Sequence, residues 1–215
     1  MKALAKTISF IFLPLFVPLY ALIAVFYVPA LPKSFYLLDA LYHYPHEAKL
    51  LYLLLFGVFI VVAPGFSLIV LKLNKSISSL SLDQREERFA PISIMIFYTA
   101  ILYVFLLYQQ ESTFVPRILK AMVLGGFLSS VIAYFWNKFE KISLHGVGMG
   151  AFVGFLFIYF AMLEKYNLIV LLIAILLAGI TLSARLYLGK HSPYEVLLGF
   201  SVGFCTQALV VYFHP

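Results

Sequence analysis

The chain has 215 residues, of which 64% are apolar and 18% aromatic, far above the roughly 45–50% apolar content of soluble domains. This composition excludes a soluble globular protein and predicts an all-α, polytopic transmembrane helix bundle, folded as a single integral membrane domain over residues 1–215. The net charge of +6 is scattered between the apolar runs, which excludes nucleic acid as a partner, and the single cysteine, Cys205, excludes an internal disulfide and a cysteine-based metal cluster.

About six to seven apolar runs are long enough to cross a bilayer, which takes about 20 residues of helix. Seven can be drawn, over residues 8–29, 49–73, 92–109, 118–137, 146–163, 167–183 and 194–212. All must be helical, because lipid offers no partner to an unpaired backbone group. The first run follows Lys2 and Lys6 and is too long for the apolar part of a cleaved signal peptide, so we expect it to span the membrane. Pro14 and Pro18 are expected to bend this helix.

Three links between the runs carry most of the charge, at residues 74–90, 137–145 and 184–199. Two spans separate each of these links from the next. The chain therefore returns to the same face each time, and all three links should emerge on one side of the membrane. The expected partners of that face are the bilayer and an anionic headgroup or phosphate, which a few well-placed Arg and Lys side chains recognise.

Small residues recur at every fourth position on two of the spans, as Gly146, Gly150 and Gly154 on one and Gly199 and Gly203 on the other. Small residues at this spacing allow helix backbones to approach closely in lipid. Both series begin just below a histidine, His145 in the first case and His191 in the second. Close packing of the two spans would bring these histidines together.

The last charged link, residues 184–199, places Arg185, His191 and Glu195 beside long apolar runs, where ionisable groups are costly and mark a functional site. The spacing Arg, five residues, His, three residues, Glu resembles the third signature motif of the type 2 phosphatidic acid phosphatase superfamily. That motif reads Ser-Arg, five residues, His, three residues, Asp. The superfamily includes membrane lipid phosphatases and haloperoxidase-like proteins.

The two other charged links resemble the remaining motifs in divergent form. Ile142-Ser143-Leu144-His145 matches the Ser and His of the second motif, Pro-Ser-Gly-His. Residues 85–91 contain Arg85, Arg88 and Pro91 where the first motif reads Lys, six residues, Arg-Pro. The resemblance thus divides the domain into N-terminal spans at about 8–73 and a phosphatase-like core at about 80–212.

The resemblance implies an integral membrane hydrolase of lipid metabolism that removes phosphate from a lipid phosphate or lipid diphosphate, without metal or cofactor. By the same resemblance, His191 attacks phosphorus to form a phosphohistidine, Glu195 orients its ring, and His145 protonates the leaving oxygen. The phosphoryl group would be held by Arg185, Arg88, Arg85 and the hydroxyl of Ser143.

The departures from the family pattern leave alternatives open. Ser192-Pro193-Tyr194-Glu195 is a good capping box, so Glu195 could serve as a helix cap, and Arg85 and Arg88 could pair with neighbouring glutamates. Ala184 replaces a family serine. A relative that binds lipid phosphates without hydrolysis, and a lipid phosphotransferase, are therefore the alternative functions.

The side of the membrane that the motifs face is not decided by charge. Once the motif residues are set aside, Lys and Arg are almost evenly divided between the two faces, so the positive-inside rule favours neither. The resemblance implies a multi-pass protein of the cell inner (cytoplasmic) membrane with its site on the outer side. Phosphatidic acid, phosphatidylglycerophosphate, a polyprenyl diphosphate and lipid A are all open as substrates.

Overall fold

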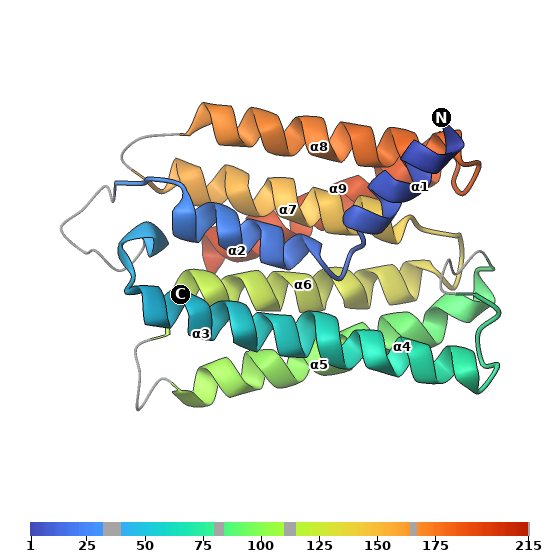
Figure 1. Cartoon of the computed structure of the whole chain (residues 1–215), viewed down its shortest axis with the longest axis horizontal. Coiled ribbons are helices and arrows are strands. Elements are labelled where there is room, and N and C mark those ends of the chain that lie inside the picture. Colours follow the sequence, from blue (N-terminus) through green and yellow to red (C-terminus); the bar gives the residue numbers. More distant parts are fainter. Residues whose placement is uncertain (32–39, 80–83, 110–114, 164–166, 215) are drawn as a thin grey trace.

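The computed structural model describes residues 1–31, 40–79, 84–109, 115–163 and 167–214, which form a bundle of roughly parallel and antiparallel helices (Figure 1). Within these residues, six helical stretches are long and apolar enough to cross a membrane. The all-α polytopic fold is therefore confirmed. The first stretch, His46–Leu73, consists of α3 (His46–Phe56), a π-helical turn (Gly57–Val62) and α4 (Ala63–Leu73). The others are α5 (Phe89–Tyr108), α6 (Arg117–Trp136), α7 (Leu144–Ala161), α8 (Leu168–Tyr187) and α9 (Pro193–Phe213).

The prediction of one bent spanning helix at residues 8–29 is wrong, because the chain forms two short helices there, α1 (Lys2–Ile11) and α2 (Val17–Tyr27). Pro14 lacks a backbone N–H and clashes with the preceding turn, so α1 stops before it. Pro18 is the second residue of α2, where the first turn leaves its missing N–H without a helical partner in any case. Isolated turns fill the break, with Phe16 N donating to Leu13 O at 2.9 Å. At 11 residues, α2 is about 16 Å long, too short to cross the bilayer alone.

The three charged links lie at the same end of the bundle, the right-hand end in Figure 1, together with α1. Hydrogen bonds join them. Arg85 Nη1 donates to Phe139 O at 2.9 Å, and Lys141 Nζ donates to Lys190 O at 3.0 Å. The prediction that all three emerge on one face is confirmed.

The most extensive helix contact in the bundle is between α7 and α9, and it depends on glycine. A Cβ atom added to Gly146 would lie 2.8 Å from Val196 O, and one added to Gly199 would lie 2.5 Å from Ser143 O. Both neighbours are backbone atoms, so neither position admits a side chain unless the helices separate. The predicted close approach of these two spans is confirmed.

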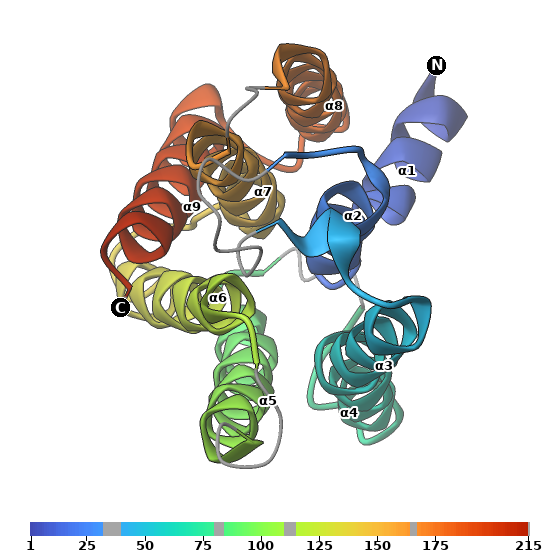
Figure 2. The same cartoon turned by 90° about the vertical axis from the view of Figure 1, so that its left-hand side faces the viewer.

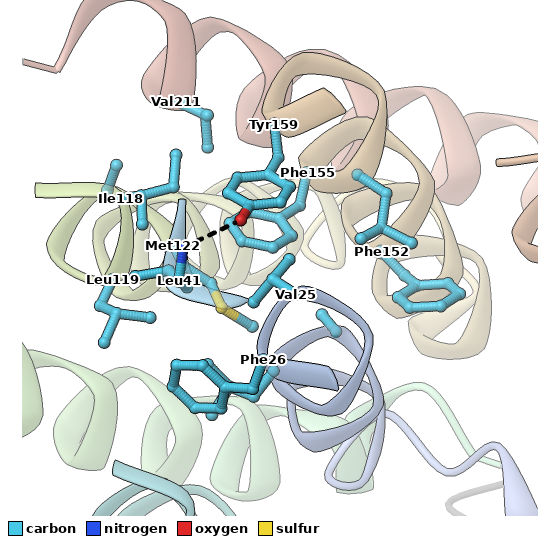
Figure 3. Packing of buried hydrophobic residues seen from close by; sticks show 14 of the residues in the cluster. Val25, Phe26, Leu41, Ile118, Leu119, Met122, Phe152, Phe155, Tyr159 and Val211 are labelled. Atoms are coloured by element: carbon cyan, nitrogen blue, oxygen red, sulfur yellow. Dashed lines mark hydrogen bonds between the residues drawn. The ribbon is translucent and has the colours of Figure 1, made fainter. Parts of the chain in front are cut away.

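The apolar core lies between α2, α6 and α7, towards the end of the bundle that is opposite the charged links (Figure 3). Phe155 and Tyr159 stack there with ring centroids 6.0 Å apart. The Tyr159 hydroxyl accepts a hydrogen bond from Leu41 N at 3.2 Å, which ties the short 3₁₀ turn at Leu41–His43 to α7. Viewed along the bundle, α5, α6 and α9 follow one side of the molecule and α2, α3 and α4 the other (Figure 2).

Candidate active site

His191 lies in the turn between α8 and α9, and the sequence of this link explains the turn. Gly189 has a φ of +63°, a left-handed conformation that glycine adopts without strain. Gly189 N donates to Leu186 O at 2.9 Å and Lys190 N donates to Arg185 O at 3.1 Å, the bond pattern of a Schellman motif. Helix α9 begins at Pro193, two residues after His191, so His191 is held between the end of α8 and the start of α9.

Glu195 contacts the ring of His191 directly. His191 Nδ1 lies 2.5 Å from Glu195 Oε2, and the ring is 2% exposed. Ser192 Oγ accepts from Glu195 N at 3.2 Å, so this residue takes part in the helix cap through its backbone while its carboxylate binds the histidine. Because a carboxylate accepts, Nδ1 carries the hydrogen and Nε2 is left with a lone pair in the neutral ring.

The electrostatic surroundings favour that neutral ring. Burial lowers the pKa of His191 well below its ordinary value, and the positive charges of Arg88, Arg185 and Lys141 lower it further. The Glu195 carboxylate favours the charged ring, but burial and the three cations, which all favour the neutral ring, outweigh it. His191 is therefore uncharged at neutral pH, which is the state in which imidazole acts as a nucleophile.

His145 is the second residue of α7, and an N-cap fixes its position. Ser143 Oγ accepts from Gly146 N at 3.2 Å, and Ser143 N donates to Glu195 O at 3.3 Å, which joins the two histidine-bearing links. On the other side, His145 Nε2 donates to Ser9 O of α1 at 3.0 Å. A backbone carbonyl only accepts, so Nε2 carries a hydrogen. Nδ1 is then the ring nitrogen that can gain or lose a proton.

The structure brings four of the predicted site residues to one cavity: His145, His191, Arg88 and Arg185. All four are buried, and Arg88 Nη1 donates to Ile142 O at 2.6 Å, which fixes the first link against the second. Buried guanidinium groups beside a neutral imidazole form a site for an anion.

Two other predicted residues lie elsewhere. The Arg85 side chain is 39% exposed, pairs with Glu86 Oε1 at 3.4 Å and binds Phe139 O. Ser143 is fully buried, and its hydroxyl caps α7. Neither belongs to the described residues that line the cavity. Both hold the charged links together.

The cavity itself has a volume of about 210 Å³ and runs from the basic residues into the bundle. Its walls are mainly apolar and come from both sides of the bundle, including Ala21, Phe56, Ile60, Ile92, Met95, Met122 and Phe155. Phe56 directly precedes the π-helical turn Gly57–Val62, and Ile60 lies within it. Such a local irregularity in a helix is frequent at functional sites. A charged mouth above an apolar interior fits an amphiphile with an anionic head.

Sequence reasoning missed three contributors to this site. Lys141 lies close enough to His191 to lower its pKa, and its position directly before the second motif was the available signal. Asn137 Nδ2 donates to Arg85 O at 3.0 Å and joins two links. Ser9 acts through its backbone carbonyl, which leaves no signature in a sequence. Among the described residues, no three His, Cys, Asp or Glu side chains are arranged to hold a metal ion.

The family model described as PAP2 superfamily matches residues 108–215 of the chain. This is about half of the chain and includes His145, Arg185, His191 and Glu195. Arg88 and α1, which also contribute to the site, lie outside the matched residues. Comparisons with curated proteins and with solved structures gave no match.

Proposed function

Because the chain belongs to the PAP2 superfamily, we propose that it hydrolyses a lipid phosphate or lipid diphosphate through a phosphohistidine intermediate, without a metal ion. Family membership and six apolar spans support the coarser description, a membrane phosphatase. The observation that carries the finer proposal is the meeting of His191, paired with Glu195, and His145 at the mouth of an apolar cavity beside two buried arginines.

In the first step, His191 Nε2 attacks phosphorus as the bond to the leaving oxygen breaks. Glu195 accepts a hydrogen bond from Nδ1–H, which stays on the ring, and stabilises the positive charge that develops there. His145 gives a proton to the leaving oxygen, so that an alcohol departs in place of an alkoxide. Since Ser9 O holds Nε2 of His145, the proton leaves from Nδ1.

In the second step, water attacks the phosphohistidine and the N–P bond breaks. His145, now neutral, takes a proton from the water, and inorganic phosphate leaves. Arg88, Arg185 and Lys141 surround the phosphoryl oxygens through both steps and stabilise the charge in each transition state. Arg85 and Ser143, which the sequence predicted as further phosphate contacts, act in this proposal by anchoring the links.

The proposal is tested by phosphate release from lipid phosphates in detergent micelles and by trapping the intermediate. His191→Ala should abolish release and labelling by a radioactive phosphoryl group. His145→Ala should slow the first step with an alkyl phosphate strongly, but spare the initial burst of p-nitrophenol from p-nitrophenyl phosphate, whose leaving group needs little protonation. Full activity in His191→Ala would refute the mechanism, and tight lipid-phosphate binding without release would indicate a non-catalytic relative.

A further inference from the structure

Helix α1 contacts the candidate active site but is held there by little buried surface. Of its ten residues only Ala5 and Ser9 are buried. The helix packs against α8, and the Ser9 carbonyl accepts the hydrogen bond from His145 Nε2 at 3.0 Å. A segment with few buried contacts has low local stability, so the position of this carbonyl depends on what surrounds the exposed part of α1.

The exposed part of α1 has an apolar side and a basic side. Leu4 and Ile11 lie seven residues apart, and therefore on one face, and they are 59% and 45% exposed. Lys2 and Lys6, four residues apart, are exposed on another face. Ser9 follows Lys6 by three residues, so the basic side adjoins the turn that contacts the active site. A helix that divides apolar and basic side chains in this way is typical of membrane interfaces.

The basic side of α1 has no acidic residue within its own helix or on α8, the helix it packs against. The first acidic residue of the chain is Asp39. The amino end of α1 lies at the charged end of the bundle and points away from the bundle axis in both views (Figure 1, Figure 2). The two lysines therefore lie near the level of the lipid headgroups. Each Lys near an anionic membrane surface strengthens binding about fivefold.

We propose that α1 binds the anionic headgroups of the surrounding bilayer and thereby holds the Ser9 carbonyl against His145, so that an anionic membrane surface activates the enzyme. This inference rests on the proposed function, in which His145 protonates the leaving oxygen from Nδ1. When α1 is seated on the membrane, Ser9 O fixes Nε2 and with it the direction of Nδ1. When α1 leaves the membrane, the ring loses this hydrogen bond and delivers its proton less often. Ser9 is a positioning residue, because it acts only through His145.

An anionic bilayer is the occupant that fits both sides of α1 at once. The neighbouring span α8 fixes the depth of α1, where hydrocarbon meets Leu4 and Ile11 while headgroups meet the two lysines. The phosphate of the substrate is the other anion that a lysine at this face can bind. The two sources of negative charge are separable, because the charge of the bilayer can be varied while the substrate is held constant.

The test places the full-length protein in vesicles of phosphatidylcholine, alone or with about 30% phosphatidylglycerol, an anionic phosphodiester. With a lipid monophosphate at constant mole fraction, the anionic lipid should raise kcat about fivefold or more. Salt at about 1 M, where the Debye length is about 3 Å, should remove this rise. The initial burst of p-nitrophenol from saturating p-nitrophenyl phosphate, which hardly needs the proton of His145, should stay the same. A general effect on folding would change both reactions together.

Two pairs of substitutions locate the effect. Lys2→Gln combined with Lys6→Gln should lose the rise. The matched control is Lys72→Gln with Lys138→Gln, which removes two exposed lysines from the same end of the bundle and should keep the rise. Equal kcat in the two vesicle types, or a rise that survives in the α1 variant, would overturn the inference and leave the phosphatase standing. A kcat lowered by the same factor in both vesicle types would show that the lysines act independently of bilayer charge, and would overturn it as well.

The fluorescence of a single tryptophan on α1 separates the binding of lipid from the chemistry. Phe10 is 66% exposed and Trp136 is the only tryptophan of the chain, so Phe10→Trp in a Trp136→Phe background reports on α1 alone. Quenching by brominated lipid should be stronger in the anionic vesicles and should weaken in salt. Equal quenching in the two vesicle types would overturn the inference whatever the activity. If no compound releases phosphate, the proposed function fails, and stronger quenching would then still show that α1 binds anionic lipid.

Discussion

Adding one methyl group at Gly199 should displace the two histidines relative to each other. In Gly199→Ala, the new Cβ would lie 2.5 Å from Ser143 O, whereas ordinary contact begins at 3.4 Å. The difference, 3.4 minus 2.5, requires the α7 and α9 backbones to separate locally by about 0.9 Å. Ser143 caps α7 just before His145, and Glu195, which holds His191, lies on α9, so the separation acts directly on the site.

A misplacement of about 1 Å at a reacting centre can lower the rate about 100-fold, and overpacking costs about 1–3 kcal/mol of stability. We therefore expect kcat for lipid phosphate release, measured per folded protein, to fall by one to two orders of magnitude, with a lowered unfolding temperature. Gly179→Ala is the matched control. Gly179 is exposed on α8 and has no atom within 4 Å of its added Cβ. Wild-type kcat in Gly199→Ala would refute the proposed dependence of the site on this helix contact.

Four further predictions follow from the same structure. Because burial and, after it, nearby cations lower the pKa of His191, activity should persist well below pH 6.5, and Lys141→Ala, which removes one cation, should move the acidic limb of the pH–rate profile to higher pH. Glu195→Gln should lower kcat at least about 100-fold by losing the charge that stabilises the ring, while Glu195→Asp should retain measurable turnover. Vanadate should inhibit phosphate release competitively and a chelator should not, as a titration of each will show. Lys75, the residue after the cap of α4, has a φ of +58°, so Lys75→Gly should raise the free energy of unfolding by about 1 kcal/mol in denaturant titrations.

The spans and the meeting of the histidines could be predicted because strong constraints act on them. Lipid forces the backbone into helices, and glycines at every fourth position specify which helices approach. Once Gly146 and Gly199 are placed in contact, His145 and His191 have little freedom to lie apart.

The N-terminal region shows where such reasoning ends. Proline at position 14 is compatible with a bent helix or a broken one, and the choice depends on a tertiary contact. A Cβ atom added to Gly148 of α7 would lie 3.3 Å from Pro14 Cα, so the break packs against the core. Ser9 enters the site only because this break turns α1 towards His145. A backbone carbonyl brought in by tertiary packing has no pattern in the sequence.

The charges around His191 show why the site should be costly without its ligand. Arg88, Arg185 and Lys141 each act on the ring of His191 as positive charges. Like charges grouped at the edge of a bilayer repel one another and destabilise the fold. A bound phosphomonoester dianion would reduce this repulsion. Phosphate ligands should therefore stabilise the protein by mass action, and the same repulsion between cations gives the site its affinity for the transferred group.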